Sequence, residues 1–259
     1  MRILVTNDDG VDAPGIEALA AALAPAFGVF VVAPATNQTG ASRSITLGAP
    51  VTVDEVEMPG GLTAFAVGGT PVDCVRFALL GLAGGPPELV VSGINAGANM
   101  GDDVMYSGTV AAALEGLLAG LPAIAVSQAS GGDREHGPRA RFEYADAAAV
   151  AARIVARVAA DGLPVGTMLN VNAPAGGVRG VRTCRLGRRR FNRAEVLPPD
   201  DEGGRHYRLY QSDFGFHDDP GTDVAALREG HVAVTPLHLD LTDHAALATL
   251  ASWDLDDLV

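Results

Sequence analysis

The chain has 259 residues, of which 48% are hydrophobic and 19% charged, a composition that excludes disordered and fibrous proteins and allows a sizeable buried core. Its formal net charge is −13, and all 18 basic residues are arginine. A chain without lysine is neither a Walker-type nucleotide triphosphatase nor a Schiff-base aldolase. Its acidic surface also argues against a membrane or a nucleic acid as the main partner.

The cysteines and the N-terminus indicate a cytoplasmic protein. Cys74 and Cys184 lie far apart without a CxxC spacing, so the sequence predicts neither a thiolate metal site nor a disulfide. The apolar run at residues 3–5 is too short for the core of a signal peptide, and no later apolar run approaches 18 residues.

Strands and helices alternate along the first two thirds of the chain. Short apolar runs predict buried strands, and apolar residues at helical spacing predict amphipathic helices between them. The expected strands are 3–5, 29–32, 89–91, 123–126 and 169–172, and the expected helices are 14–23, 72–80, 109–118 and 144–160. This alternation predicts an α/β fold with a mostly parallel sheet. The loops at 7–10, 36–44 and 95–109 should then converge at the carboxyl edge of that sheet, where ligands bind.

Residues 176–217 differ from the rest because arginines are dense there and the helical period is lost. Short β-prone pieces between turns predict a projecting β-hairpin arm within a single domain, 1–259, rather than a core layer. Strands are expected again at 231–235 and 237–241. The arginines at 188–190 allow several interpretations. They could form a solvated hairpin face, contact a neighbouring subunit or bind an anionic ligand, and a weaker alternative is that the arm binds RNA.

Asp8 and Asp9 stand next to each other where the first strand ends. An Asx turn in the N-D-D-G loop is the simpler interpretation. The other two strand-end loops, however, offer the Thr39 hydroxyl and the Asn95 carboxamide, and such oxygen donors suit Mg²⁺ or Mn²⁺. The four side chains together therefore predict a site for a hard divalent cation.

A second constellation, Tyr106-Ser107-Gly108-Thr109, directly precedes an Ala-rich helix. Ser107 or Thr109 could serve simply as the helix N-cap. The glycine-rich loop before it favours an anion site, built from two hydroxyls and the free N–H groups of the first helical turn. A cation next to an anion site points to phosphate ester hydrolysis, in which the metal polarises the phosphoryl oxygen and activates water.

Several ordered motifs resemble the SurE family, the survival-protein nucleotidases. The motifs run along nearly the whole chain, at 5–10, 13–15, 40–42, 69–71, 91–95, 106–110, 169–172, 187–189, 221–223 and 234–237. The resemblance implies a metal-dependent acid phosphatase that acts on nucleoside 5′- and 3′-monophosphates, with polyphosphate activity in some members. It also implies a Rossmann-like core and a homodimer or homotetramer assembled through exchanged C-terminal segments.

Carried over by position, Asp8, Asp9 and Asn95 match the family's metal ligands. Ser107, Gly108 and Thr109 match its phosphate-contacting loop, and Asn95 is expected to contact the phosphate as well. One cation per subunit, Mg²⁺ or Mn²⁺, is expected, with Asp8 and Asp9 as catalytic groups and Asp9 assisting proton transfer. Two positions depart from the family. Thr39 replaces the usual serine and keeps the hydroxyl, whereas 35–36 read Ala-Thr in place of Asp-Arg.

Two functions are consistent with these residues. The first is phosphomonoester hydrolysis. The alternative is a protein that binds or senses nucleotides at the same site without turnover, which phosphate release with Mn²⁺ and after chelation would distinguish.

Overall fold

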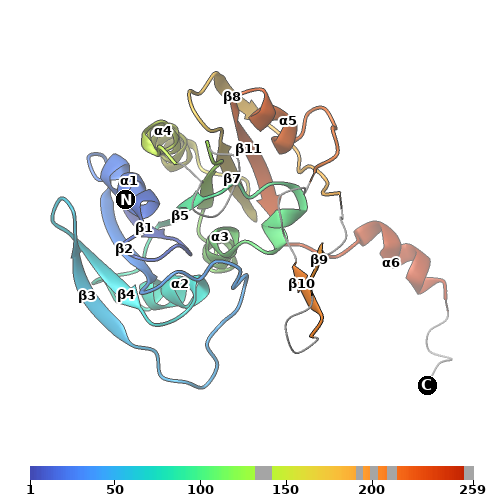
Figure 1. Ribbon diagram of the computed structural model, residues 1–259. Coiled ribbons are helices and arrows are strands. Elements are labelled where there is room, and N and C mark those ends of the chain that lie inside the picture. The colour runs from blue at the N-terminus through green and yellow to red at the C-terminus, as the bar shows by residue number, and fades with distance from the viewer. Residues whose placement is uncertain (132–141, 191–194, 199–203, 209–214, 254–259) are drawn as a thin grey trace.

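The computed structural model describes residues 1–131, 142–190, 195–198, 204–208 and 215–253. A nine-stranded, mostly parallel sheet forms the centre of the molecule (Figure 1). In spatial order its strands are β3 (Val53–Met58), β4 (Leu62–Val67), β2 (Gly28–Pro34), β1 (Arg2–Thr6), β5 (Leu89–Ala96), β6 (Ala123–Gln128), β7 (Thr167–Ala173), β11 (His231–His238) and β8 (Gly180–Thr183). Among the described strands of this sheet, the β3–β4 and β7–β11 pairs are antiparallel and the other pairs are parallel.

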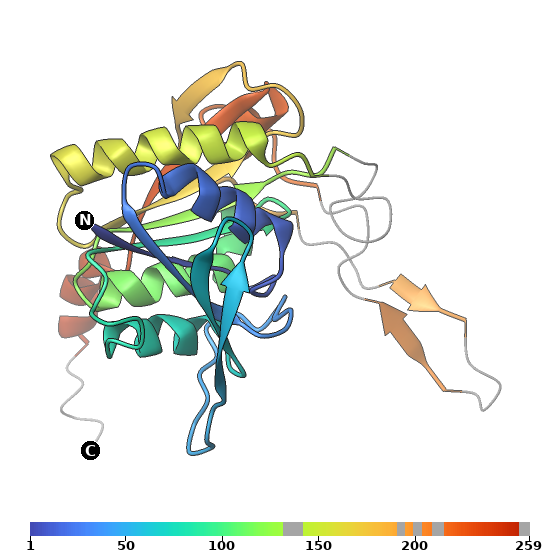
Figure 2. The same ribbon diagram turned by 90° about the vertical axis from the view of Figure 1, so that its left-hand side faces the viewer.

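Helices cover both faces of the sheet and make it a three-layer structure (Figure 2). One face carries α1 (Pro14–Leu23) and α4 (Ala145–Asp161), and the other carries α2 (Pro71–Leu79) and α3 (Gly108–Leu118). Successive side chains of β1 pack against opposite helix layers: Ile3 and Val5 pack on the α1 side, and Leu4 packs on the α3 side. The predicted α/β class with a Rossmann-like, mostly parallel core is confirmed.

Helices α2 and α3 begin where the sequence supplies a capping side chain. At α2, Pro71 follows Thr70, whose hydroxyl accepts the Asp73 N–H while the Asp73 carboxylate accepts the Thr70 N–H. The Ser107 hydroxyl accepts the Val110 N–H and caps α3. The remaining helices are α5 (Asp223–Arg228), α6 (His244–Ala251) and the 3₁₀ turn η1 (Gly101–Met105).

Three features at the sheet edges and the C-terminus differ from the sequence prediction. The β3–β4 hairpin was not predicted, because β3 alternates mostly exposed and half-buried residues instead of forming an apolar run. The strands expected at 231–235 and 237–241 are one strand, β11, which ends at His238. Helix α6 was also not predicted, and none of its residues is buried.

The arm region is only partly what the sequence predicts. A hairpin exists, formed by β9 (Glu195–Leu197) and β10 (His206–Arg208), and Figure 2 shows it projecting from the body. At the start of the same region, however, β8 pairs with β11 and extends the main sheet, so the expectation that no part of 176–217 joins a core layer was wrong there. Three of the four β8 residues are exposed, which explains why the strand lacks an apolar signature. Phe191 and part of the linker 130–141 lie outside the described residues.

Both cysteines are buried free thiols, in agreement with the predicted absence of a disulfide between them. Within the described ranges, no helix has the length and apolarity that crossing a membrane requires.

Candidate active site

The loops that follow β1, β2 and β5 meet at the carboxyl edge of the sheet. The Asp9 carboxylate accepts a hydrogen bond from the backbone N–H of Ala96 at 3.0 Å. The backbone N–H of Gln38 donates to the carbonyl oxygen of Asp8 at 2.7 Å. The strand order reverses at β1, with β2 on one side and β5 on the other, so this edge is the topological switch point where open α/β sheets bind ligands.

Asp8 is buried against the N-terminus of α3. The Thr109 hydroxyl donates a hydrogen bond to Asp8 Oδ1. A Cβ atom at Gly108 would lie 2.7 Å from Asp8 Oδ2, which is closer than a real Cβ contact allows. Glycine is therefore required at position 108 for the carboxylate to lie this close to the helix. The contact brings the predicted metal-binding and phosphate-binding residues to one place.

The electrostatics of this place fit a bound cation. Burial raises the pKa of Asp8 to about 6, the Thr109 hydrogen bond opposes the shift, and the charge of Asp9 adds to it. Among the described residues, no positive charge contributes to the shift at Asp8. Two neighbouring carboxylates with neutral oxygen donors form a hard, oxygen-only set of the kind that Mg²⁺ and Mn²⁺ prefer. The described residues contain no cluster of three or more His, Cys, Asp or Glu side chains, so the set depends on Asn and Thr oxygens.

The structure places the two neutral donors differently. Asn95 is buried and precedes Ala96, and its Nδ2 donates to the Gly97 carbonyl at 2.8 Å. This orientation leaves Oδ1 as the acceptor for a cation or a hydrogen-bond donor. Thr39 follows Gln38, whose backbone N–H donates to the Asp8 carbonyl, but its own side chain is exposed. The hydrogen bond that the structure gives Thr39 is made by its backbone N–H, which donates to Asn37 Oδ1 at 2.7 Å.

Asn99 fixes the long loop between β5 and α3 to the sheet. Its N–H donates to Asn172 Oδ1 at 2.8 Å and its Nδ2 donates to Ser127 Oγ at 2.8 Å. Its carbonyl oxygen accepts from the side chains of Asn170 and Asn172. Sequence analysis assigned no role to these residues, although buried polar side chains in a predicted core strand are a recognisable signal.

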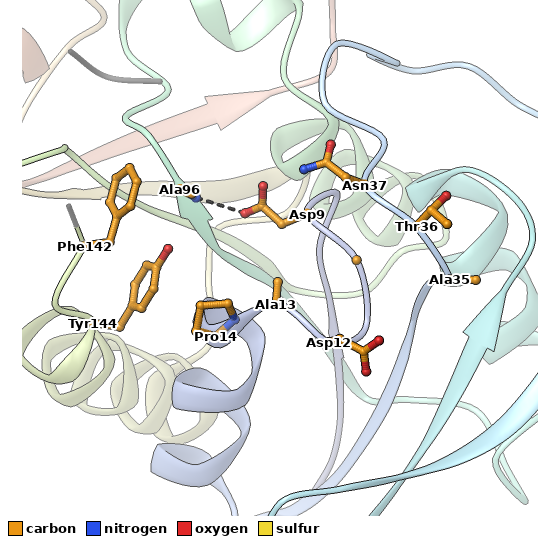
Figure 3. A pocket seen from close by; sticks show the side chains of 11 residues that line it. Asp9, Asp12, Ala13, Pro14, Ala35, Thr36, Asn37, Ala96, Phe142 and Tyr144 are labelled. Carbon is orange, nitrogen blue, oxygen red and sulfur yellow. Dashed lines mark hydrogen bonds between the residues drawn. The ribbon is translucent and has the colours of Figure 1, made fainter. Parts of the chain in front are cut away.

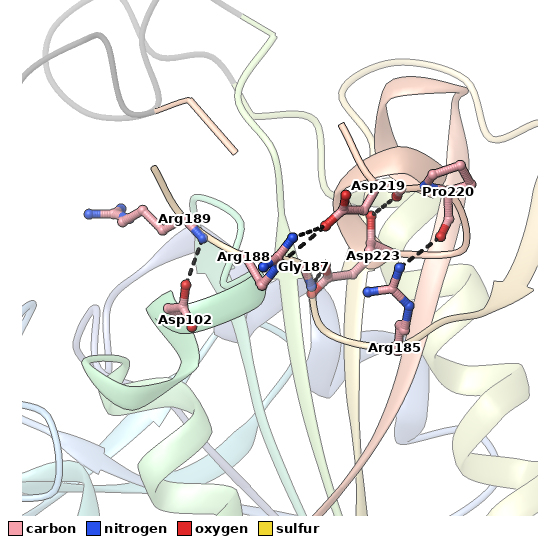
Figure 4. Close-up of polar contacts among 9 residues, drawn as sticks. Asp102, Arg185, Gly187, Arg188, Arg189, Asp219, Pro220 and Asp223 are labelled. Carbon is pink, nitrogen blue, oxygen red and sulfur yellow. Dashed lines mark hydrogen bonds and ion pairs between the residues drawn. The ribbon is translucent and has the colours of Figure 1, made fainter. Parts of the chain in front are cut away.

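A second set of contacts holds the same loop from the root of the arm (Figure 4). The buried Asp223 carboxylate accepts from the backbone N–H groups of Gly101 and Gly187, at 2.9 and 2.8 Å. The Asp102 carboxylate accepts from the backbone N–H of Arg189 at 2.6 Å, and the Arg189 guanidinium pairs with Asp103 at 2.7 Å. Burial raises the pKa of Asp103, whereas the Arg189 charge lowers it.

A cavity of about 510 Å³ opens beside Asp9 (Figure 3). Its lining comes from the start of α1, the loop after β2, the end of β5 and the segment before α4, and comprises Asp9, Gly10, Asp12, Ala13, Pro14, Ala35, Thr36, Asn37, Ala96, Phe142 and Tyr144. Burial, and secondarily the charge of Asp9, raises the pKa of Tyr144 to about 12. Phe142 and Tyr144 were not predicted as site residues, because their only signal in the sequence is a pair of aromatic residues at the end of a polar linker.

Fold and site together define an α/β protein in which carboxylate, amide and hydroxyl groups meet at the switch point of a parallel sheet. Residues 3–193 match the family described as Survival protein SurE, and the chain belongs to that family.

Similar proteins cover the whole chain. The 5′-nucleotidase SurE of Rubrobacter xylanophilus is 48% identical over 100% of this chain and 99% of its own length. The 5′-nucleotidase SurE of Syntrophotalea carbinolica is 47% identical over 98% of each chain. The crystal structure of the SurE protein from Aquifex aeolicus superimposes with a TM-score of 0.82 at 36% identity, and the match covers 97% of this chain and 99% of that one.

Proposed function

We propose that this chain is a metal-dependent phosphomonoesterase that hydrolyses nucleoside 5′- and 3′-monophosphates. The observation that carries the proposal is the contact of the buried Asp8 carboxylate with Gly108 and Thr109 at the N-terminus of α3, beside Asp9 and Asn95. The relatives named 5′-nucleotidase SurE support the 5′-nucleotidase part of this activity.

One Mg²⁺ or Mn²⁺ ion per subunit would be held by Asp8, Asp9, Asn95 and Thr39. When bound, such a cation polarises a phosphoryl oxygen and lowers the pKa of water. The Thr109 hydroxyl fixes the orientation of Asp8, and the Ala96 N–H fixes that of Asp9. Asp9 is half-buried and borders the cavity, so we assign to its ionised carboxylate a role in proton transfer, as an acceptor for the proton that the attacking water loses.

The phosphate would be held by Asn95 and by Ser107, Gly108 and Thr109 at the start of α3. The first N–H groups of a helix lack intrahelical partners and point toward an anion, and the helix dipole adds to the attraction. The Ser107 oxygen accepts the Val110 N–H, and its own O–H remains a donor for phosphate. Helix capping and phosphate binding by Ser107 are therefore compatible.

Location, assembly and the range of phosphate donors are also proposals. The two buried free thiols suit a reducing cytoplasm. The projecting β9–β10 hairpin suits exchange between subunits in a homodimer or homotetramer. Short polyphosphate is a further candidate substrate for the same assay.

Phosphate release from a panel of nucleoside 5′- and 3′-monophosphates tests the function directly. We expect turnover with Mn²⁺ or Mg²⁺, loss of turnover after chelation, and a fall of at least about a hundredfold in Asp8→Asn. Activity that survives both chelation and Asp8→Asn contradicts the metal site. Nucleotide binding without any phosphate release by the metal-loaded wild type identifies the non-catalytic alternative instead.

Thr39 needs a matched pair of variants because its side chain is exposed. If its hydroxyl is a ligand, Thr39→Val weakens Mn²⁺ binding measured by calorimetry, whereas Thr39→Ser keeps the affinity within about twofold. Equal affinities in both variants remove Thr39 from the ligand set and leave Asp8, Asp9 and Asn95.

A further inference from the structure

The cavity beside Asp9 has the size and position of a subsite for the leaving group. Its volume of about 510 Å³ falls within the roughly 300–1,000 Å³ of small-molecule sites. It shares Asp9 with the metal and phosphate site and has Ala96, the residue after Asn95, in its lining. A phosphate ester bound at Asp8 and Gly108 therefore has this space beside it for the rest of the molecule.

One wall of the cavity is aromatic. The rings of Phe142 and Tyr144 are parallel within 8°, with their centroids 5.8 Å apart. Figure 3 shows the two rings across the cavity from Asn37 and Thr36. Phe142 is only half-buried and precedes α4, so its ring retains surface on which a flat ligand can lie. Nucleobases stack on aromatic side chains irrespective of the base, because every base has a π-face.

The charge of the cavity selects between types of leaving group. The described residues that line it include the carboxylates of Asp9 and Asp12 and no arginine or histidine. A second phosphate group, as in a nucleoside diphosphate or a polyphosphate, would lie near Asp12 with no arginine or histidine in the described lining to offset the repulsion, because a bound cation would neutralise Asp9 but not Asp12. An uncharged nucleoside avoids this repulsion, and its hydroxyl and amino groups can donate to the exposed Asp12 carboxylate.

We propose that this cavity is the nucleoside subsite, in which the base stacks on Phe142 within the aromatic wall and Asp12 disfavours any further phosphate. The inference rests on the proposed nucleotidase function and deepens it, since it makes Phe142 and Asp12 specificity-determining residues. Tyr144 also packs into the core beneath α1, so Phe142 is the better residue to change.

The test compares AMP with ribose 5-phosphate, which lacks a base. In Phe142→Leu we expect kcat/KM for AMP to fall about tenfold while that for ribose 5-phosphate changes by less than about twofold. Phe142→Trp restores the preference for AMP. Phe27→Leu, a change at the opposite edge of the sheet where β2 begins, leaves both substrates unaffected. An unchanged AMP preference in a folded Phe142→Leu protein overturns the stacking assignment.

Two further measurements separate this inference from the proposed function. Calorimetry with adenosine needs no turnover, so wild-type binding that Phe142→Leu loses supports the subsite even if no phosphate is released. Absence of adenosine binding by the wild type overturns the subsite even if AMP is hydrolysed. Asp12 is exposed, so we expect Asp12→Asn to fold normally. Because it removes a negative charge from the cavity, the variant should raise the ratio of pyrophosphate hydrolysis to AMP hydrolysis roughly threefold. An unchanged ratio removes Asp12 from the selection.

Discussion

Asp223 and Gly101 are separated by 122 positions, and the Asp223 carboxylate accepts a hydrogen bond from the Gly101 backbone N–H at 2.9 Å. The second oxygen of the same carboxylate accepts from Gly187 and Val224, both at 2.8 Å. Gly101 begins η1, which leads to Ser107. One fully buried side chain therefore joins the loop proposed to bind phosphate to the start of the arm at Gly187.

We expect Asp223→Asn to destabilise the fold. Both carboxylate oxygens of the wild type accept hydrogen bonds from backbone N–H groups, and in the variant one of these oxygens is replaced by an NH₂ group, which leaves a backbone donor without an acceptor. An unpaired buried donor costs about 1–3 kcal/mol, which for a chain of this size lowers the melting temperature by roughly 3–10 °C. Thermal unfolding followed by circular dichroism measures the change. The matched variant Asp218→Asn alters an ion pair whose aspartate is 84% exposed and should leave the melting temperature nearly unchanged. Equal melting temperatures for the two variants would contradict a structural role of Asp223.

Gly108→Ala should separate activity from stability. The added methyl group would lie 2.7 Å from Asp8 Oδ2 and displace the carboxylate, although alanine favours a helix more than glycine does. We expect phosphate release to fall at least about tenfold and Mn²⁺ affinity to fall with it, at a melting temperature within a few degrees of the wild type. Gly177→Ala is the control, since its methyl group would meet no atom within 4 Å. Full activity of Gly108→Ala would show that the contact with Asp8 is not needed.

Asp73 gives a prediction for the pH dependence of stability. Burial alone would raise the pKa of Asp73, but hydrogen bonds from Thr46 and Thr70 outweigh it and hold the pKa below the usual aspartate value. A lowered pKa in the folded state means that the ionised group stabilises the fold above the unfolded pKa. This contribution is lost as the pH falls through the folded pKa.

Urea unfolding from pH 7 to pH 3 measures the contribution of Asp73. Asp73→Asn should be less stable than the wild type at pH 7, and the difference should shrink as the pH falls below 4. The comparison variant is Asp54→Asn, which removes an exposed carboxylate of β3. A difference that grows toward acid pH would mean that the pKa of Asp73 is raised and not lowered.

The sequence was most informative where one physical signal dominated. The apolar runs of β1, β5 and β6 are buried throughout most of their length, so they predicted the central strands and the edge at which the loops meet. The polar edge strands β3 and β8 gave no such signal, because an edge strand buries little on either face.

The candidate site was predictable as a convergence of loops but not as a set of contacts. Strand ends predicted that Asp8, Asp9 and Asn95 would lie near one another, and the structure brings their segments together. The roles of Asn99 and Asp223 depend on pairings across 73 and 122 positions, which no local pattern encodes. Likewise, the aromatic wall of Phe142 and Tyr144 becomes part of a cavity only when α1 and α4 pack side by side.

Helix α6 has eight residues, none of them buried, and it leaves Leu247 and Leu250 facing solvent with Trp253 just beyond it. A helix of this length is marginal in water without packing. Helix α6 therefore gains lasting helical order only when a second surface shields these side chains. Any condition that removes such a surface would then lower the ellipticity of α6 before it affects the sheet.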